Sequence, residues 1–100
     1  MGLMSGTSMD GVDAAVVEIN EKSINVISKY NEPYDEELKQ ELLFIRDNKK
    51  SINLDDFARL DHKVGKFFGA AALSAIKESK IKSSQIQAIG SHGQTIRHQP

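Results

Sequence analysis

The first third of the chain has the alternating apolar pattern of β-strands. Residues 12–19 are rich in β-branched side chains, and residues 23–30 alternate again between apolar and polar positions after a short polar turn. We therefore predict two strands joined as a β-hairpin. Residues 31–34, which contain a proline, are predicted to be a connection. The residues expected on one face of the second strand are Ile24, Val26 and Ser28.

The middle of the chain has helical spacing. Between residues 35 and 47, apolar side chains recur every three or four positions, and acidic residues lie in the first turn, where the helix dipole favours them. A second helix is predicted to run to about residue 80, because Asn53 is a typical N-cap residue and a broad apolar face follows it. This face consists of Phe57, Leu60, Val64, Phe67, Phe68, Ala71 and Ala75.

The last part of the chain is predicted to return to the sheet. Residues 86–89 read as a short strand, and the polar, glycine-containing residues 90–95 as a loop after it. Two antiparallel strands, a helical layer and a further strand predict an α/β fold in which the last strand returns through a crossover.

Composition and charge restrict the class of protein. The 100 residues are 39% hydrophobic and 27% charged, which is typical of one soluble globular domain with a single modest core. Thirteen Lys and Arg balance fourteen Asp and Glu, so the sequence has neither the basic field of a nucleic-acid-binding protein nor a membrane-binding patch. It has no cysteine, which excludes a disulfide framework and a thiol nucleophile. Without a long apolar segment or a signal-peptide pattern, we expect a cytoplasmic protein.

Residues 5–11 form a polar loop whose composition suits phosphate binding. The loop holds two glycines and three hydroxyl side chains. Glycines let backbone amides converge on a phosphate, hydroxyls donate to anionic oxygens, and an acidic residue can hold Mg²⁺ through water. Gly6 and Gly11 have the Walker spacing, but Val12 and Asp13 stand where that motif needs Lys and Ser or Thr. A tight hairpin turn explains the same composition, so both interpretations stay open.

The second polar segment, residues 90–95, follows the last predicted strand. Ligands of open α/β sheets gather outside the carboxyl ends of strands. Its side chains can exchange hydrogen bonds with a sugar or another small polar ligand, and they can equally satisfy their own backbone. The side chains in question are His92, Gln94 and Thr95.

Two further classes of site are disfavoured. A hydrolase would use Ser5 or Ser8 as nucleophile and His92 as base, but neither serine lies in a G-x-S-x-G motif and no orienting acid is evident. The three histidines have no metal-ligand spacing, which argues against a structural metal site.

The two polar segments together resemble one enzyme family. Residues 2–15 (GLMSGTSMDGVDAA) closely resemble the start of the anhydro-N-acetylmuramic acid kinases, and residues 89–96 (IGSHGQTI) resemble their second signature. The resemblance implies a ribonuclease-H-like (actin-like ATPase) partial domain that opens with a β-hairpin, in the superfamily of sugar kinases, actin and the chaperone ATPases. The reaction it implies uses ATP and water to open 1,6-anhydro-N-acetylmuramic acid, a small amino sugar, and gives N-acetylmuramic acid 6-phosphate during cell-wall recycling.

The resemblance also implies site residues and partners. The residues expected around the ATP phosphates are Gly6, Thr7, Ser8, Met9, Asp10, Gly11, Val12 and Asp13. Those expected at the sugar are Ser91, His92, Gly93, Gln94 and Thr95. Asp10 is the candidate for a water-mediated Mg²⁺ contact, and the parent protein is expected to be a homodimer.

The family's general base, its second phosphate loop and its adenosine pocket are expected beyond residue 100. Residues 1–100 are therefore predicted to be the N-terminal part of the first lobe of a two-lobed kinase, without the remaining lobe, without a catalytic residue and inactive alone. The alternatives are a kinase of another sugar in the same superfamily and a noncatalytic nucleotide- or sugar-binding module.

Overall fold

The computed structural model describes residues 1–6, 8–47 and 51–97. Its strands are β1 (Gly2–Ser5), β2 (Gly11–Ile19), β3 (Ile24–Pro33) and β4 (Gly90–Gln94). Its helices are α1 (Glu36–Asp47), α2 (Leu54–Ser79) and the short 3-10 helix η1 (Ser83–Gln85). The predicted hairpin and both predicted helices are confirmed.

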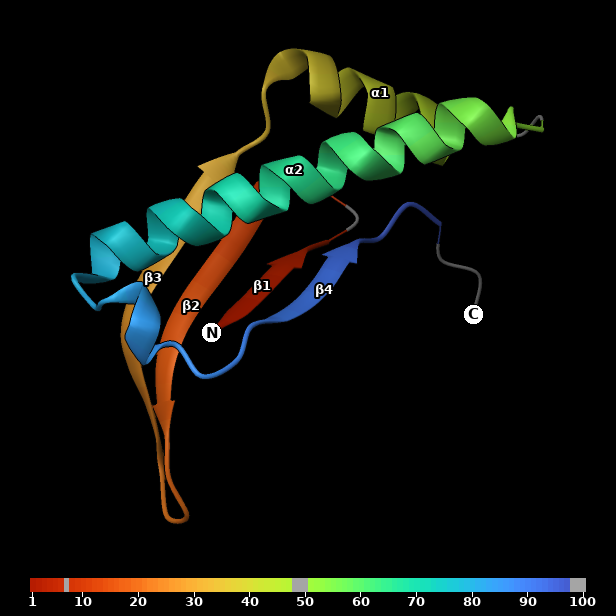
Figure 1. Cartoon of the computed structure of the whole chain (residues 1–100). Coiled ribbons are helices and arrows are strands. Elements are labelled where there is room, and N and C mark those ends of the chain that lie inside the picture. The colour runs from red at the N-terminus through yellow and green to blue at the C-terminus, as the bar shows by residue number, and fades with distance from the viewer. Residues whose placement is uncertain (7, 48–50, 98–100) are drawn as a thin grey trace.

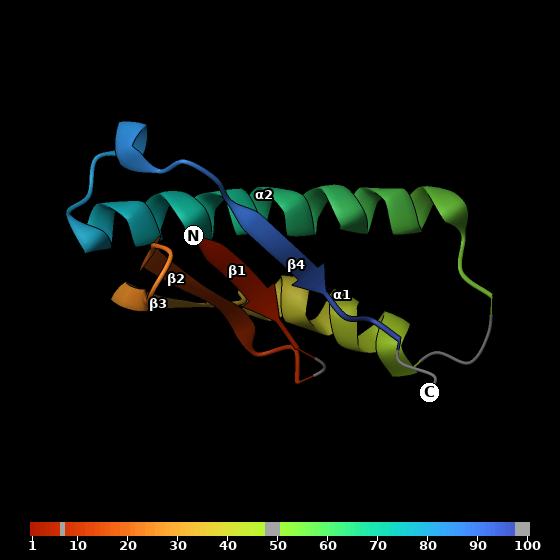
Figure 2. The same cartoon turned by 90° about the horizontal axis from the view of Figure 1, so that it is seen from below.

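The four strands form one mixed sheet in the order β3-β2-β1-β4. β1 pairs antiparallel with β2 and β2 antiparallel with β3, whereas β4 lies parallel to β1. Figures 1 and 2 show α2 crossing one face of the sheet, with α1 alongside its first half. This arrangement confirms the predicted α/β fold and agrees with the N-terminal region of an actin-like ATPase.

The predicted position of the last strand is wrong. Residues 90–94, expected to be a loop, form β4, and residues 86–89 precede it. Backbone hydrogen bonds join β4 to β1, and Gly90 N donates to Met1 O at 2.9 Å. Such bonds require no apolar or β-branched side chain. The neighbouring strand, from the opposite end of the chain, therefore determines β4.

β3 extends further than predicted. It continues through residues 31–33, expected to be a connection, and ends where Pro33 pairs with Gly11. β3 lies at the edge of the sheet, where a proline is tolerated because its missing N–H leaves no neighbouring carbonyl unpaired.

A bulge in β3 changes which of its side chains share a face. Val16 pairs with Ser28, and the next residue, Val17, pairs with Val26. Ile27 is therefore the extra residue. Partners in a sheet share a face and neighbours along β2 alternate, so Ser28 and Val26 lie on opposite faces. The expectation that they share a face is wrong.

Both long helices begin with a side-chain cap. Asp35 Oδ1 accepts from Leu38 N at 2.8 Å, and Asn53 Oδ1 accepts from Asp55 N at 2.8 Å. The predicted N-cap of α2 is therefore confirmed, and α2 ends at Lys80 in the left-handed conformation (φ 62°).

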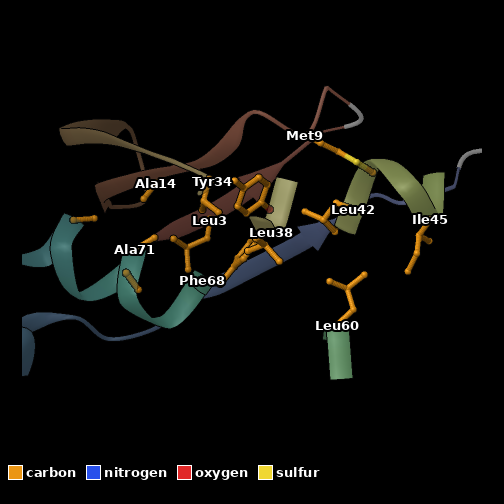
Figure 3. Close-up of a cluster of buried hydrophobic side chains, with 13 residues drawn as sticks. Leu3, Met9, Ala14, Tyr34, Leu38, Leu42, Ile45, Leu60, Phe68 and Ala71 are labelled. Carbon is orange, nitrogen blue, oxygen red and sulfur yellow. The ribbon is translucent and has the colours of Figure 1, made fainter. Parts of the chain in front are cut away.

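One apolar core joins the helices to the sheet and to the loop between β1 and β2. Figure 3 shows side chains of β1, α1 and α2 converging around Tyr34. Most of the predicted face of α2 packs here, although Phe57 is exposed. The end of the β2–β3 hairpin extends beyond the helices, and Ile19 and Ile24 are each 69% exposed there. The main core side chains are Leu3, Met9, Tyr34, Leu38, Leu42, Leu60 and Phe68.

Candidate functional site

The two polar segments singled out in the sequence lie side by side. β1 ends at Ser5 and β4 ends at Gln94, and these two residues are partners in the parallel pair. Parallel strands end at the same edge of a sheet, so the loop that follows β1 lies next to the end of β4 (Figure 1). Ser5 and Gln94, which are 89 residues apart along the chain, therefore lie together in one candidate site.

The loop after β1 is anchored by an apolar side chain. Met9 is fully buried, and Figure 3 shows it reaching from the loop toward α1. Its backbone is left-handed (φ 55°), which is uncommon for a residue with a side chain. Met9 N donates to Gly6 O at 3.2 Å and closes a turn. Val12 is also fully buried. Both side chains therefore belong to the core rather than to the exposed surface of the loop.

Gly11 is explained by the close approach of β3. A Cβ atom on Gly11 would lie 2.4 Å from Glu32 O and 2.8 Å from Pro33 Cα, and both are backbone atoms. Only glycine fits there without displacing the strand. Gly11 thus sets the distance between β2 and β3 at the end of the loop.

The exposed part of the loop carries polar and charged groups. Ser8 is exposed, and the Asp10 side chain is 74% exposed. Lys39 of α1 brings its Nζ to 3.5 Å from Asp10 Oδ1. A hydroxyl, a carboxylate and an ammonium group therefore lie at one surface. Thr7, the remaining hydroxyl predicted here, lies outside the described residues.

Asp13 lies away from this surface, within the sheet. It pairs with Asn31 across the β2–β3 ladder, and Asn31 Nδ2 donates to Asp13 Oδ1 at 2.8 Å. The two acidic residues of the motif therefore differ in surroundings, because Asp10 contacts a helix and Asp13 contacts a strand.

Gln94 joins the two segments through all of its polar atoms. Its Nε2 donates to Gly6 O and to Thr95 O, each at 2.7 Å. Its Oε1 accepts from the Tyr34 hydroxyl at 2.8 Å and lies 2.6 Å from Ser5 Oγ. Because Nε2 faces two carbonyl oxygens, the reverse orientation of the amide would place oxygen against oxygen. A glutamine amide has two donors and two acceptor positions. Both donors and one acceptor position are engaged here, and Ser5 Oγ lies at the second acceptor position.

Ser5 and Tyr34 complete this cluster. Ser5 is 2% exposed, and its hydroxyl oxygen also lies 2.6 Å from Gly11 O, so its single proton serves Gly11 or Gln94 at one time. Tyr34 N donates to Asp10 O at 3.1 Å. Burial raises the pKa of Tyr34 above its ordinary value, and a hydrogen bond with Ser5 partly offsets this. The phenol thus remains a donor at neutral pH.

A bulge at Gly93 sets the direction of the side chains of β4. Leu3 pairs with Ser91 and Ser5 with Gln94, so β4 uses one residue more than β1 between these two pairs. Gly93 has φ +78°, which a residue with a side chain rarely adopts.

An open pocket lies between the helices and β4. Residues of α1 and α2 form its apolar wall, and β4 supplies polar groups, a combination common in small-molecule sites. His92 is exposed at its rim, with Nδ1 3.4 Å from Gly93 O. The lining includes Leu42, Phe57, Phe68, Ser91, His92 and Gln94.

The geometry does not favour the hydrolase interpretation. The Ser5 hydroxyl is buried against Gly11 and Gln94 rather than against His92. Within the described ranges, no group of three or more His, Cys, Asp or Glu could hold a metal ion by itself. In the same ranges, no helix is both long enough and apolar enough to cross a membrane.

Sequence reasoning missed two residues of the site. Tyr34 lies in a segment predicted to be a connection, where an aromatic residue beside a proline was the only local signal. Lys39 is one of several charged residues on an amphipathic helix, and nothing in its local sequence distinguishes it.

Comparison with known proteins gives matches along the whole chain. The family model described as anhydro-N-acetylmuramic acid kinase matches residues 1–100. Proteins named anhydro-N-acetylmuramic acid kinase are 41% identical in Vibrio vulnificus (strain CMCP6) and 45% identical in Aliivibrio fischeri, each over 100 residues. One from Xylella fastidiosa is 46% identical over 103 residues. In each case all of this chain is covered but only 27% of the relative.

Proposed function

Because the chain belongs to the anhydro-N-acetylmuramic acid kinase family, we propose that it is the N-terminal part of the first lobe of a two-lobed, ATP-dependent kinase. The parent enzyme opens 1,6-anhydro-N-acetylmuramic acid with water and phosphorylates it to N-acetylmuramic acid 6-phosphate. The observation that carries this proposal is the match over the whole chain, with both signature segments in one place.

The loop after β1 is the proposed binding site for the ATP phosphates. Its glycines and its turn leave room for backbone amides, and Ser8 presents a hydroxyl to the same surface. Lys39 adds a positive charge 3.5 Å from Asp10. Phosphoryl transfer depends mainly on positioning and on neutralising the phosphate charge, and this surface offers both.

Asp10 is the proposed Mg²⁺ contact. Mg²⁺ in such sites usually keeps several waters and is held by one or two carboxylates together with phosphates. One exposed carboxylate beside the loop fits that requirement, and no larger acidic cluster is needed. When bound, the ion would neutralise charge on the phosphate oxygens. Asp10 would orient its water shell, and Lys39 would hold the Asp10 carboxylate in place.

The proposed sugar site is the open pocket between the helices and β4. Ser91, His92 and Thr95 supply groups that can bind sugar hydroxyls and the amide, and Gly93 lets the strand bend at that point. The general base and the adenosine pocket are proposed to lie outside these 100 residues.

The proposed setting is cell-wall recycling in the cytoplasm by a homodimeric enzyme. Its partner is a small amino sugar. The nearly balanced charge of the chain, −1 overall, gives no support for binding to nucleic acid or to a membrane.

A kinase assay tests the proposal. The kinase that carries this segment is incubated with ATP, Mg²⁺ and the anhydro sugar, and the product is identified by mass spectrometry. We expect N-acetylmuramic acid 6-phosphate, loss of activity on chelation, and weak turnover with other sugars in a substrate panel. The isolated 100-residue chain should give no product above a no-enzyme control. Preference for another sugar, or activity of the isolated chain, would contradict the proposal.

The role of Asp10 has its own test. Asp10→Ala should reduce Mg²⁺-dependent turnover far more than it reduces the melting temperature, because its side chain is largely exposed. Glu21→Ala is the matched control, since Glu21 is an exposed acid in the turn at the opposite end of β2. Equal turnover of both variants would exclude the role proposed for Asp10.

A further inference from the structure

We propose that Gln94 is a positioning residue that holds the candidate phosphate loop in its nucleotide-binding conformation, and that it does not bind the sugar. This inference rests on the proposed function, because it assumes that the loop after β1 receives the ATP phosphates.

The first argument is the limited hydrogen-bonding capacity of the Gln94 amide. Its two N–H groups donate to Gly6 O and Thr95 O, and its oxygen accepts from Tyr34. Ser5 Oγ lies 2.6 Å from the same oxygen and occupies its remaining side, whether its proton goes to Gln94 or to Gly11. A sugar hydroxyl could bind to Gln94 only by displacing one of these partners, each of which is at least half-buried. A buried donor or acceptor that loses its partner without replacement is strongly unfavourable. The side chain is therefore already committed within the protein.

The second argument is the effect on the loop. The Gly6 carbonyl accepts from Gln94 Nε2 at 2.7 Å and from Met9 N at 3.2 Å. These two donors fix the direction of the carbonyl. Without Gln94, the partial negative charge of this oxygen could turn toward the phosphates and repel them.

The third argument is that the same cluster holds the other end of the loop. Tyr34 donates its hydroxyl proton to Gln94 and its backbone N–H to Asp10 O. Ser5 lies between Gln94 Oε1 and Gly11 O. Gln94 thus connects to both ends of the loop, and its position on β4 places it next to the proposed sugar pocket.

The test separates nucleotide binding from sugar binding in the kinase that carries this segment. Gln94→Met keeps the length of the side chain and removes its amide. Calorimetry measures the affinity for the Mg²⁺ complex of a non-hydrolysable ATP analogue alone, and for the anhydro sugar alone. We expect the nucleotide affinity to fall about tenfold, as for the loss of one or two net hydrogen bonds. We expect the sugar affinity to stay within about twofold of the wild type.

Two further variants distinguish a local effect on this cluster from a general loss of folding. Tyr34→Phe removes one hydroxyl from the cluster and keeps the ring that packs 4.9 Å from the Phe67 ring. It should shift the nucleotide affinity in the same direction by about threefold. Gln87→Met is the matched control, because Gln87 is exposed in the segment before β4, and both affinities should be unchanged.

The possible outcomes are distinct. Weakened sugar affinity with unchanged nucleotide affinity would identify Gln94 as a sugar ligand and overturn the inference. Unchanged affinities, or equal losses of both, would overturn it as well. A wild-type kinase that does not bind the nucleotide analogue would overturn the proposed function along with it. A nucleotide-specific loss in both Gln94→Met and Tyr34→Phe would support the inference.

Discussion

Met9 combines a buried side chain with a backbone conformation that favours glycine. The side chain is fully buried in the core, so shortening it to alanine should lower the free energy of unfolding by about 2–5 kcal/mol. The backbone at Met9 is left-handed, with φ 55°. This conformation costs a residue with a side chain about 1–2 kcal/mol relative to glycine. Met9→Gly loses one methyl group more than Met9→Ala but relieves that strain.

The expected order of the two variants is therefore unusual. Met9→Gly should be more stable than Met9→Ala by about 1 kcal/mol, after the entropy cost of glycine offsets part of the relieved strain. Leu42 is the matched control, because it is 1% exposed and lies within α1. At this helical position glycine should be less stable than alanine by about 1 kcal/mol. At each position, the free energy of unfolding of the alanine variant is subtracted from that of the glycine variant. This difference should be about 2 kcal/mol larger at Met9 than at Leu42.

Urea unfolding of the four variants at one protein concentration, followed by far-ultraviolet circular dichroism, measures this comparison. Both variants at a position lack the original side chain beyond Cβ. The free-energy cost of the cavity that it leaves therefore largely cancels when glycine is compared with alanine. If glycine lowered the free energy of unfolding relative to alanine by the same amount at Met9 and at Leu42, the assignment of strain to the loop would be refuted.

Four further predictions concern other parts of the chain. Gly11→Ala should destabilise the fold by about 1–3 kcal/mol in urea, since the new methyl group would lie 2.4 Å from a backbone oxygen; wild-type stability would contradict this. Asn53→Ala should cost about 1 kcal/mol in the same assay, through loss of the cap of α2, and no change would exclude the cap. Lys39→Met should weaken binding of the Mg²⁺–ATP analogue about two- to fivefold, whereas Lys39→Arg should retain it; equal affinities would argue against a phosphate contact. The pKa of Tyr30 is raised because its phenol donates to Glu32, so Glu32→Gln should lower this pKa in an ultraviolet titration and leave the second tyrosine unchanged.

Local patterns predicted those elements whose own side chains determine their structure. Residues 12–19 are apolar and β-branched, and the cap of α2 depends on Asn53 and its next few neighbours. β4 differs because its residues are small and polar, and it becomes a strand only beside β1. Residues 31–33 likewise join β3 because Gly11 allows that strand to approach.

The candidate site could be predicted only in part for the same reason. The motif composition suited a phosphate loop and a tight turn equally, and the structure leaves the Ser8 and Asp10 side chains exposed. The burial of Met9 within a polar segment depends on α1, and the contacts of Gln94 depend on a loop 88 residues earlier. Contacts between residues so far apart in the sequence form only when the sheet assembles, and no pattern in the neighbouring sequence predicts them.

The extra residue at Gly93 decides which face of the sheet Gln94 occupies. Residues three positions apart lie on opposite faces of a regular strand, but the bulge places Ser91 and Gln94 on the face of their partners Leu3 and Ser5. A side chain at position 93 would disfavour the positive φ of the bulge, and a regular strand with the same spacing would turn Gln94 away from Ser5 and Gly6. Substitution at His92 leaves that connection in place. Related chains can therefore be expected to tolerate other residue types at position 92 more readily than at position 93.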